Sequence, residues 1–440
     1  MRVMSAGEKI KQLRMDIGLN QVDLANDTVT RSLISMIENN KRSLTANTAA
    51  IIAASLNRYY LNLGKEITPE YLLETEEKQA QRLIIEKYHE ILTQMTEPLA
   101  SKENDFEERF RRLIIFAEQW RLYAVAIEIM EARGRYFYTI KKYNEALKDF
   151  FTAQEYYLQN ALHNKSAANY IMIGSCHNYL MLYEQALLYF DQADHIISSQ
   201  ITYAMREIKS QLSFQRLLCF RGLKKHDLVL QEISVYKSLG YLDEGPYHHV
   251  LQLEANTYRD LKNFDRAIQT YERLLKMAGQ LSNDHMLMIY GNYAELYRLK
   301  GEYHRSLQHI EKARSYAPEG TADHIAFLSL CEAQCYSALD FSEQAISTID
   351  QCLVIIPQIT QKDLVLKLYC LLVELLIEIG NFQRTEIILP QFEAFVLDQQ
   401  MKDQLIQVYS YYILLYCKTK DLEKCYEQTN KLLALRRCSL

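Results

Sequence analysis

The chain has 440 residues, a formal net charge of −5, 49% hydrophobic residues and 24% charged residues. This composition allows a large core, with two to four domains or one small domain before a long array. Only 6 Pro and 13 Gly occur, and strand-rich folds usually need more of both for their turns, so we expect an all-α protein.

The N-terminal segment lacks the long apolar core of a signal peptide, and no window approaches the roughly 18 consecutive apolar residues of a membrane span. We therefore expect a cytoplasmic protein without membrane contact. Charge is uneven along the chain. Residues 1–60 carry 8 Lys/Arg and 5 Asp/Glu, a net of +3, which leaves 42 and 50, a net of −8, for the other 380 residues. A basic head on an acidic body predicts that only the head meets a polyanion.

The head contains four stretches with the pattern of short helices. They cover residues 8–17, 21–27, 30–39 and 45–57. In the second stretch, "QVDLAND", we expect Val22 and Leu24 to face inward. Thr30 is the candidate N-cap of the third. Two short helices joined by a tight turn predict a helix-turn-helix, whose second helix enters the major groove of DNA.

The segment "TRSLISMIENNKR", residues 30–42, supplies most of the candidate DNA contacts. Small Ser and Thr side chains let the helix approach the bases, Arg31 can make a bidentate contact to guanine, and the loop after the helix can meet phosphate. Gln21, at the start of the preceding helix, can donate to phosphate beside that helix's N-terminal amides. The predicted DNA-binding residues are Gln21, Thr30, Arg31, Ser32, Ser35, Asn40, Lys41 and Arg42.

The sequence "LNQVDLANDTVTRSLISMIENNKR" resembles the Cro/repressor-type helix-turn-helix, and the resemblance covers residues 7–57. Arg14 and Glu38 match an Arg–Glu pair of that family, which implies a structural role for both. The sequence departs from the family in having Asn40 where Gly is frequent, and in a shorter turn. The alternative is a small helical bundle with no DNA role.

Gly64 and Pro69 interrupt the chain after the head. The predicted domains are a DNA-binding domain at 1–62, a linker-helix region at 63–100 and a repeat domain at 101–440 for peptide binding and dimerisation.

Beyond residue 100 one phrase recurs, as in "KKYNEAL", "MLYEQAL", "KNFDRAI" and "GEYHRSL". Each copy has an aromatic residue at a turn and then a small residue near the start of a helix. The marker residues, 38–43 positions apart, are Ala146, Ala186, Val229, Ala267, Ser306, Ala345, Thr385 and Cys425. Gly or Ala stands twelve positions earlier at Gly134, Gly174, Ala255, Ala294 and Ala333. This pattern resembles lengthened tetratricopeptide repeats, which implies a right-handed superhelix of about eight helix pairs.

The first helix of each pair is expected to line the concave face of such an array. Amide side chains there can satisfy the N–H and C=O groups of an extended peptide, and Arg can bind its carboxylates. The predicted peptide-binding residues are Asn178, Gln215, Arg221, Gln252, Asn256, Arg259, Asn292 and Arg298. The alternative is an ordinary solvated helix face.

We find no Gly-rich phosphate loop, HExxH, GxSxG or EF-hand spacing. The nine Cys are scattered, and Cys331 and Cys335 lack further ligands at a suitable spacing. Of the adjacent His248 and His249, at most one is expected to face the groove. The sequence therefore predicts no enzyme, no cofactor and no metal site.

A Cro-type head followed by tetratricopeptide repeats resembles the RRNPP group of peptide-responsive quorum-sensing regulators. The resemblance implies a homodimeric transcription regulator that binds double-stranded DNA and holds a short signalling peptide in the repeat groove. Two alternatives stay open. The repeats can bind a protein partner such as a phosphorelay component, or they can only dimerise a constitutive repressor.

Overall fold

The structure is a computed structural model, and it describes residues 2–96, 105–199, 203–240, 247–277, 281–316, 322–399 and 401–438. The chain divides into two compact units, Met1–Leu223 and Lys224–Leu440. The described residues form helices and no strands, which confirms the all-α prediction. Among these helices, none combines the length and the apolar character that crossing a bilayer requires.

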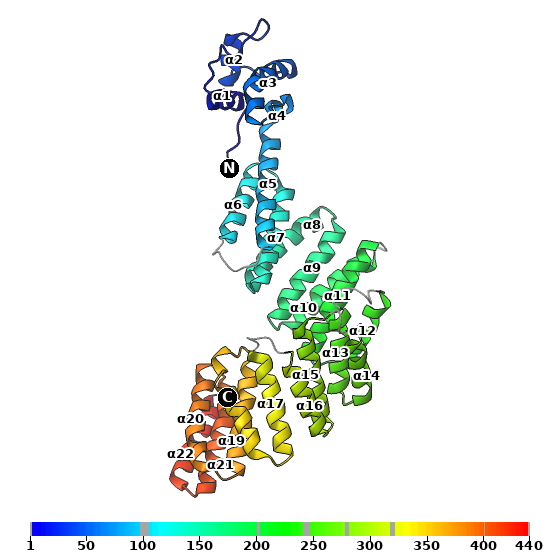
Figure 1. Ribbon diagram of the computed structural model, residues 1–440, viewed down its shortest axis with the longest axis vertical. Helices are drawn as coiled ribbons and strands as arrows, with labels where there is room; N and C mark the ends of the chain where they lie inside the picture. Colours follow the sequence, from blue (N-terminus) through cyan, green and yellow to red (C-terminus); the bar gives the residue numbers. More distant parts are fainter. Residues whose placement is uncertain are drawn as a thin grey trace. The chain divides into compact units, whose positions relative to one another are not determined.

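The first unit begins with four short helices and continues with longer ones (Figure 1). Its elements are α1 (Ala6–Asp16), α2 (Arg31–Glu38), α3 (Ala46–Tyr60), η1 (Leu61–Leu63), α4 (Pro69–Leu73), α5 (Glu76–Thr96), α6 (Phe106–Gln119), α7 (Tyr123–Thr139), α8 (Tyr143–Gln159), α9 (His163–Tyr179), α10 (Tyr183–Ser198) and α11 (Tyr203–Gly222).

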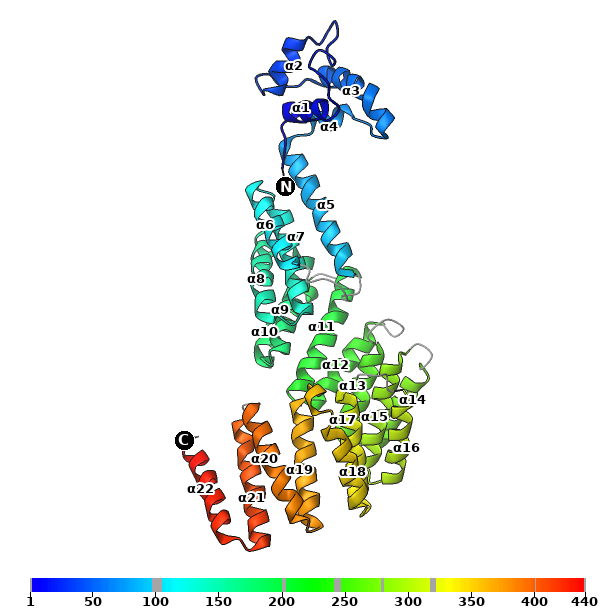
Figure 2. The same ribbon diagram turned by 60° about the vertical axis from the view of Figure 1, so that its left-hand side comes forward.

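In the second unit, successive helices run alongside one another in antiparallel pairs (Figure 2). Its elements are α12 (His226–Ser238), α13 (Tyr247–Asp260), α14 (Phe264–Leu275), α15 (Asn283–Leu299), α16 (Tyr303–Arg314), α17 (Ala322–Ala338), α18 (Ser342–Leu353), η3 (Ile356–Gln358), α19 (Lys362–Glu378), α20 (Phe382–Asp398), η4 (Lys402–Gln404), α21 (Leu405–Thr419) and α22 (Leu422–Cys438).

The helix predicted at 21–27 is absent. Residues 21–24 form a turn, residues 25 and 26 are irregular, and a bend begins at residue 27. Leu24 is buried as expected, but Val22 is 57% exposed. The physical reason is local competition for backbone groups. The Asp23 carboxylate accepts from the Asn20 N–H at 2.6 Å, and the Asn26 side-chain oxygen accepts from the N–H groups of Thr28 and Val29. These side chains stabilise turns in place of a helical turn.

The core of the head is a single cluster of buried apolar side chains. It includes Ile10 of α1, Ile34 of α2 and Ile52 of α3, and it extends to Ile67 and Leu72 beyond the third helix. The short helix α4 therefore packs with the head, although it follows the predicted boundary at residue 62. The three-domain division remains a prediction.

The repeat pattern is visible in burial and in backbone conformation. The described residues from α7 to α22 contain the eight expected helix pairs. Seven of the eight marker residues are buried: Ala146, Ala186, Val229, Ala267, Ser306, Ala345 and Thr385. Within each pair of α7 to α10 and α13 to α22, the tight turn places one residue in the left-handed region. Lys141, Met181 and Gly301 are examples, with φ of 63°, 60° and 84°.

The small residue of the first helix permits close contact with the second. At Gly174 of α9, an added Cβ would lie 2.4 Å from Cε1 of Phe190 on α10, and at Gly134 of α7 it would lie 2.9 Å from Cε1 of Phe150 on α8. Because real Cβ atoms do not approach so closely, only Gly fits opposite these two Phe rings.

Candidate DNA-recognition surface and repeat-helix site

Helix α2 has an apolar face on the core and a polar face in solvent. Ile34 and Ile37 are buried. Thr30 caps the helix as predicted, since its hydroxyl oxygen accepts from the Leu33 N–H at 3.3 Å. This cap fixes where the helix begins, so Arg31 is its first residue.

The side chains predicted to reach the bases lie on the outer face of α2. Arg31 and Ser32 are exposed, and Ser35 is half-buried. In the loop after the helix, Lys41 and Arg42 are also exposed. Their positive charges are therefore accessible to a polyanion.

Asn40 is held in a conformation that Gly adopts more easily. Its φ is 55°, in the left-handed region where Asn is among the better tolerated non-Gly residues. The Asn40 side-chain oxygen accepts from Ser5 Oγ at 2.8 Å, so this atom is already engaged within the head. Beside Asn40, the backbone of α1 at Gly7 approaches the end of α2 closely. A Cβ on Gly7 would be 2.1 Å from the Ile37 carbonyl oxygen.

Arg14 and Glu38 join α1 to α2. Arg14 donates from Nε and Nη2 to the two Glu38 carboxylate oxygens at 2.7 and 2.9 Å, and from Nη1 to the Leu19 carbonyl oxygen at 2.7 Å. Gln21 Nε2 also donates to Glu38, at 2.8 Å, so this predicted phosphate contact is occupied inside the head. Burial alone would raise the pKa of Glu38, but the hydrogen bonds from Arg14 and Gln21 hold its pKa below the ordinary value.

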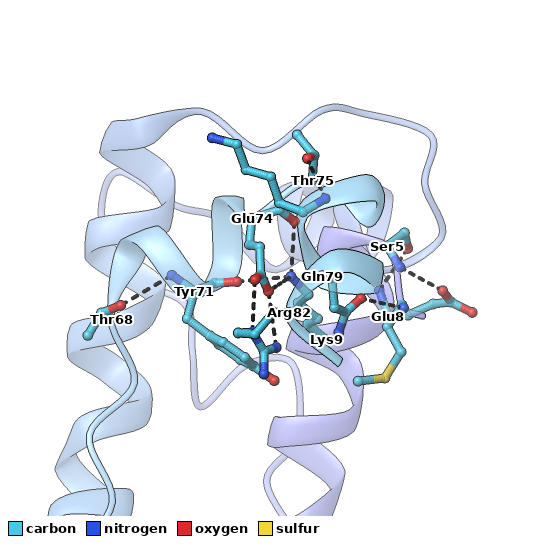
Figure 3. Close-up of polar contacts among 11 residues, drawn as sticks. Ser5, Glu8, Lys9, Thr68, Tyr71, Glu74, Thr75, Gln79 and Arg82 are labelled. Atoms are coloured by element: carbon cyan, nitrogen blue, oxygen red, sulfur yellow. Dashed lines mark hydrogen bonds and ion pairs between the residues drawn. The ribbon is translucent and has the colours of Figure 1, made fainter. Parts of the chain in front are cut away.

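The sequence prediction missed a buried lysine that ties α1 to the end of α4 and the residue after it (Figure 3). The Lys9 side chain is fully buried. Its Nζ donates to the carbonyl oxygens of Tyr71 and Glu74 at 3.0 Å each, and to Glu74 Oε2 at 3.3 Å. Arg82 of α5 donates to the other Glu74 oxygen at 3.0 Å. Burial lowers the pKa of Lys9, and the hydrogen bond to Glu74 opposes this shift.

Two further contacts reinforce this connection. The Met4 N–H donates to Gln79 Oε1 of α5 at 2.7 Å, and Ser5 and Glu8 form a capping box at the start of α1 (Figure 3). A sequence signal for Lys9 existed, because this residue lies one helical turn before the inward-facing Leu13.

In the second unit, the predicted peptide-binding arginines already have partners. Arg259 donates to Asp260 Oδ1 at 2.8 Å and to Asn292 Oδ1 at 3.2 Å. Arg298 makes two bonds to the Glu295 carboxylate, at 2.7 and 2.8 Å. The structure thus brings Arg259 and Asn292 together and balances both positive charges with neighbouring carboxylates.

The remaining predicted peptide-binding residues are divided between the two units. In the second unit, Gln252 and Asn256 are half-buried, and Asn256 accepts from the hydroxyl of Tyr271. In the first unit, Asn178 is half-buried and Arg221 is exposed. The Oε1 atom of the half-buried Gln215 has no hydrogen-bond partner among the described residues.

Among the described residues, one group could hold a metal ion. It consists of His248, His249 and His285, whose nearest ring nitrogens lie within 4.8 Å of one another. The pKa of His249 is lowered to about 4, mainly by burial and to a smaller extent by the neighbouring His248 and His285. The sequence prediction considered only the adjacent pair, because His285 lies one repeat away along the chain.

Comparison with protein-family models gives two matches. Residues 10–61 match a helix-turn-helix model, and residues 250–319 match a tetratricopeptide-repeat model. No curated protein sequence matches this chain at a significant level.

Three solved structures are among those to which this chain is similar. The tetratricopeptide-repeat sensor protein PH0952 of the STAND class, from Pyrococcus horikoshii, is 14% identical, with 92% of this chain and 65% of that chain covered and a TM-score of 0.51. PlcR from Bacillus thuringiensis, in complex with the peptide PapR7 and DNA, is 16% identical, with coverages of 80% and 96% and a TM-score of 0.31. Apo NprR from B. thuringiensis is 13% identical, with coverages of 89% and 96% and a TM-score of 0.43. At 14% identity the likeness to PH0952 concerns the fold alone.

Proposed function

We propose that this chain, which joins a Cro-type helix-turn-helix domain to tetratricopeptide repeats as RRNPP-type regulators do, is a DNA-binding transcription regulator of the cytoplasm under the control of a short peptide. The observation that carries the DNA-binding part is the outer face of α2. There a capped helix presents Arg31 and Ser32 to solvent, with Lys41 and Arg42 in the following loop.

The supporting chemistry is direct. The first turn of a capped helix can enter the major groove, where Arg recognises guanine and small hydroxyl side chains allow close approach. The exposed cations after the helix can contact phosphate without reading sequence. The proposed base contacts are Arg31, Ser32 and Ser35. Thr30 fixes where the helix begins, and the proposed contacts to the DNA phosphates are Asn40, Lys41 and Arg42. Gln21 is less suited to a phosphate contact than the sequence suggested, because its amide donates to Glu38.

Selection from a pool of random duplexes by the full-length chain tests this function. Enrichment of one sequence with two-fold symmetry is the expected outcome, since dimeric helix-turn-helix proteins bind paired half-sites. A pool that remains random after several rounds, with equal affinity for every duplex, would contradict it.

The peptide-binding part is supported by the half-buried polar side chains of the first helices. Asn256, Asn292 and Gln252 can pair with the backbone of an extended peptide. Because Arg259 and Arg298 already have carboxylate partners, an acidic ligand would have to exchange with Asp260 and Glu295 at these positions.

Selection of short peptides by the immobilised full-length chain provides the test. Asn256→Ala and Arg259→Ala are each expected to lower the affinity for the selected peptide, because the peptide's amides or carboxylate lose a partner. Gln308→Ala, at an exposed position of the second helix α16, is the matched control. Peptides that bind both variants and the control equally would place the ligand elsewhere. Selection of no peptide would favour a protein partner or a constitutive repressor.

A further inference from the structure

Three histidines of the second unit meet where two repeat helices begin. His248 and His249 lie in the first turn of α13, and His285 lies in the first turn of α15. These are the first helices of consecutive repeats, so the three rings come together only when the repeats stack. All three side chains are half-buried.

The distance between His248 and His285 suits two ligands of one metal ion. Their Nε2 atoms are 3.1 Å apart. With zinc–nitrogen bonds of about 2.0–2.1 Å and tetrahedral geometry, two imidazole ligands lie roughly 3.3 Å from each other. The ring centroid of His249 is 4.0 Å from that of His248 and 5.2 Å from that of His285, which places a third imidazole beside the same point.

Ser282 orients the His285 ring. Its Oγ lies 2.7 Å from His285 Nδ1 and also accepts from the His285 backbone N–H at 3.4 Å. When Nδ1–H donates to this hydroxyl, Nε2 carries a lone pair that faces His248. A hydrogen bond to the distal ring nitrogen is the usual way in which proteins orient a metal-binding histidine. Since two facing lone pairs repel, either a proton or a cation must lie between these Nε2 atoms.

A single hydrogen bond between His248 and His285 would explain the pair but not the third ring. Three clustered imidazoles with no thiolate among them favour a borderline divalent transition metal over calcium or magnesium, which prefer oxygen. Zinc tolerates three protein ligands with water in the fourth position. The partial positive charge of two helix N-termini opposes cation binding, so the free energy of binding must come from the metal–nitrogen bonds.

We propose that His248, His249 and His285 bind one zinc ion that clamps the first turn of α13 to the first turn of α15. This site is independent of the proposed DNA and peptide binding. Its consequence is that zinc stiffens the junction between these two repeats.

Zinc titration of the full-length chain after removal of metal by a chelator provides the test, with calorimetry and elemental analysis as readouts. One equivalent of zinc per chain is expected, together with a rise in the midpoint of thermal unfolding. Cobalt in place of zinc should give the visible d–d absorption bands of a four-coordinate Co(II) ion. His249→Ala and His285→Ala should each abolish the stoichiometric binding, and Ser282→Ala should weaken it by roughly 10–100-fold.

Two controls keep the outcome decisive. His304→Ala removes an exposed histidine of α16 and should leave binding unchanged. Cys417 and Cys425 could bind zinc adventitiously, because their Sγ atoms are 3.5 Å apart. The Cys417→Ser, Cys425→Ser double variant should therefore still bind one equivalent. Helicity measured by circular dichroism verifies that each variant folds. Zinc binding that survives in the histidine variants, that is lost in the cysteine variant, or that is absent from the parent chain would overturn the proposal.

Discussion

At the scale of single residues, the head contains buried charges that each have specific partners. Lys9 and Glu38 are the clearest cases, since both are buried and both make several hydrogen bonds. A buried charge costs free energy unless its partners are in place, so removing either end of such a contact should destabilise the head. By contrast, the charges on the outer face of α2 should affect binding and not folding.

Arg31→Ala is expected to lose roughly 1–3 kcal/mol at one operator position and to relax specificity there. Lys41→Ala should weaken all duplexes alike and reduce the salt dependence of binding, because a phosphate contact carries no sequence information. Fluorescence anisotropy with the selected operator and its single-base variants distinguishes the two effects. An unchanged order of preference in Arg31→Ala would exclude the base-reading role.

Lys9→Met should destabilise the head by roughly 1–3 kcal/mol, since the Tyr71 and Glu74 carbonyl oxygens lose a buried donor. Lys11→Met is the matched control, because Lys11 lies on the same helix and is exposed. Urea titration followed by the amide NMR signals of α1 and α2 measures the difference. Equal stability of the two variants would show that the Lys9 contacts contribute nothing net.

Acid should weaken the head through Glu38. Its pKa in the folded state lies below the ordinary value of 4.5, so its contribution to stability is complete above about pH 4.5 and is lost as the pH falls through the folded-state pKa. Glu38→Gln should therefore be less stable at neutral pH and show a shallower loss on acidification. The same urea titration, repeated between about pH 7 and about pH 3 with Glu66→Gln as an exposed control, tests this. A parallel pH dependence in parent and Glu38→Gln would contradict it.

At the scale of elements, a small residue on the first helix of a repeat packs against a large side chain on the second helix. Gly174 and Gly134 lie against Phe rings, whereas three later repeats have Ala255, Ala294 and Ala333 at the equivalent position. A Cβ at Gly174 or Gly134 would overlap the facing Phe ring, so Ala should not replace Gly at these two positions without loss of stability.

Gly174→Ala is therefore expected to destabilise its repeat by about 1–3 kcal/mol, because the new Cβ would overlap the Phe190 ring. Phe190→Leu in the same chain should recover part of this loss by vacating the ring position. Thermal unfolding of the single and double variants forms a double-mutant cycle. Strictly additive effects would show that the two side chains do not interact.

At the scale of the whole molecule, the proposed function requires two heads on one operator. We predict that the repeats dimerise the chain, so the full-length chain should bind two half-sites about 34 Å apart. A fragment ending after Arg82 should fold, because it retains Ile67, Leu72 and the Lys9 partner Glu74, yet bind the same operator weakly. Inserting about half a helical turn between the half-sites should abolish tight binding by the full chain. Sedimentation and operator titration measure both effects, and tight binding by the monomeric fragment would refute the assignment.

The sequence by itself determined what depends on local pattern. Periodic apolar residues predicted the helices, and the recurring small residues predicted the repeat, because both reflect contacts between neighbours in the chain. Thr30 was identified as a cap for the same reason. The predicted helix at 21–27 failed because Asp23 and Asn26 compete for backbone groups, and apolar periodicity does not report that competition.

Only the tertiary structure decided which distant residues meet. Lys9 reaches Glu74 across 65 positions, Arg259 pairs with Asn292 from the next repeat, and His285 joins His248 and His249. Each of these contacts is fixed by how the helices pack. Side-chain direction on a packed helix depends on its neighbours in space, so residue type and spacing identified the candidates but could not give their partners.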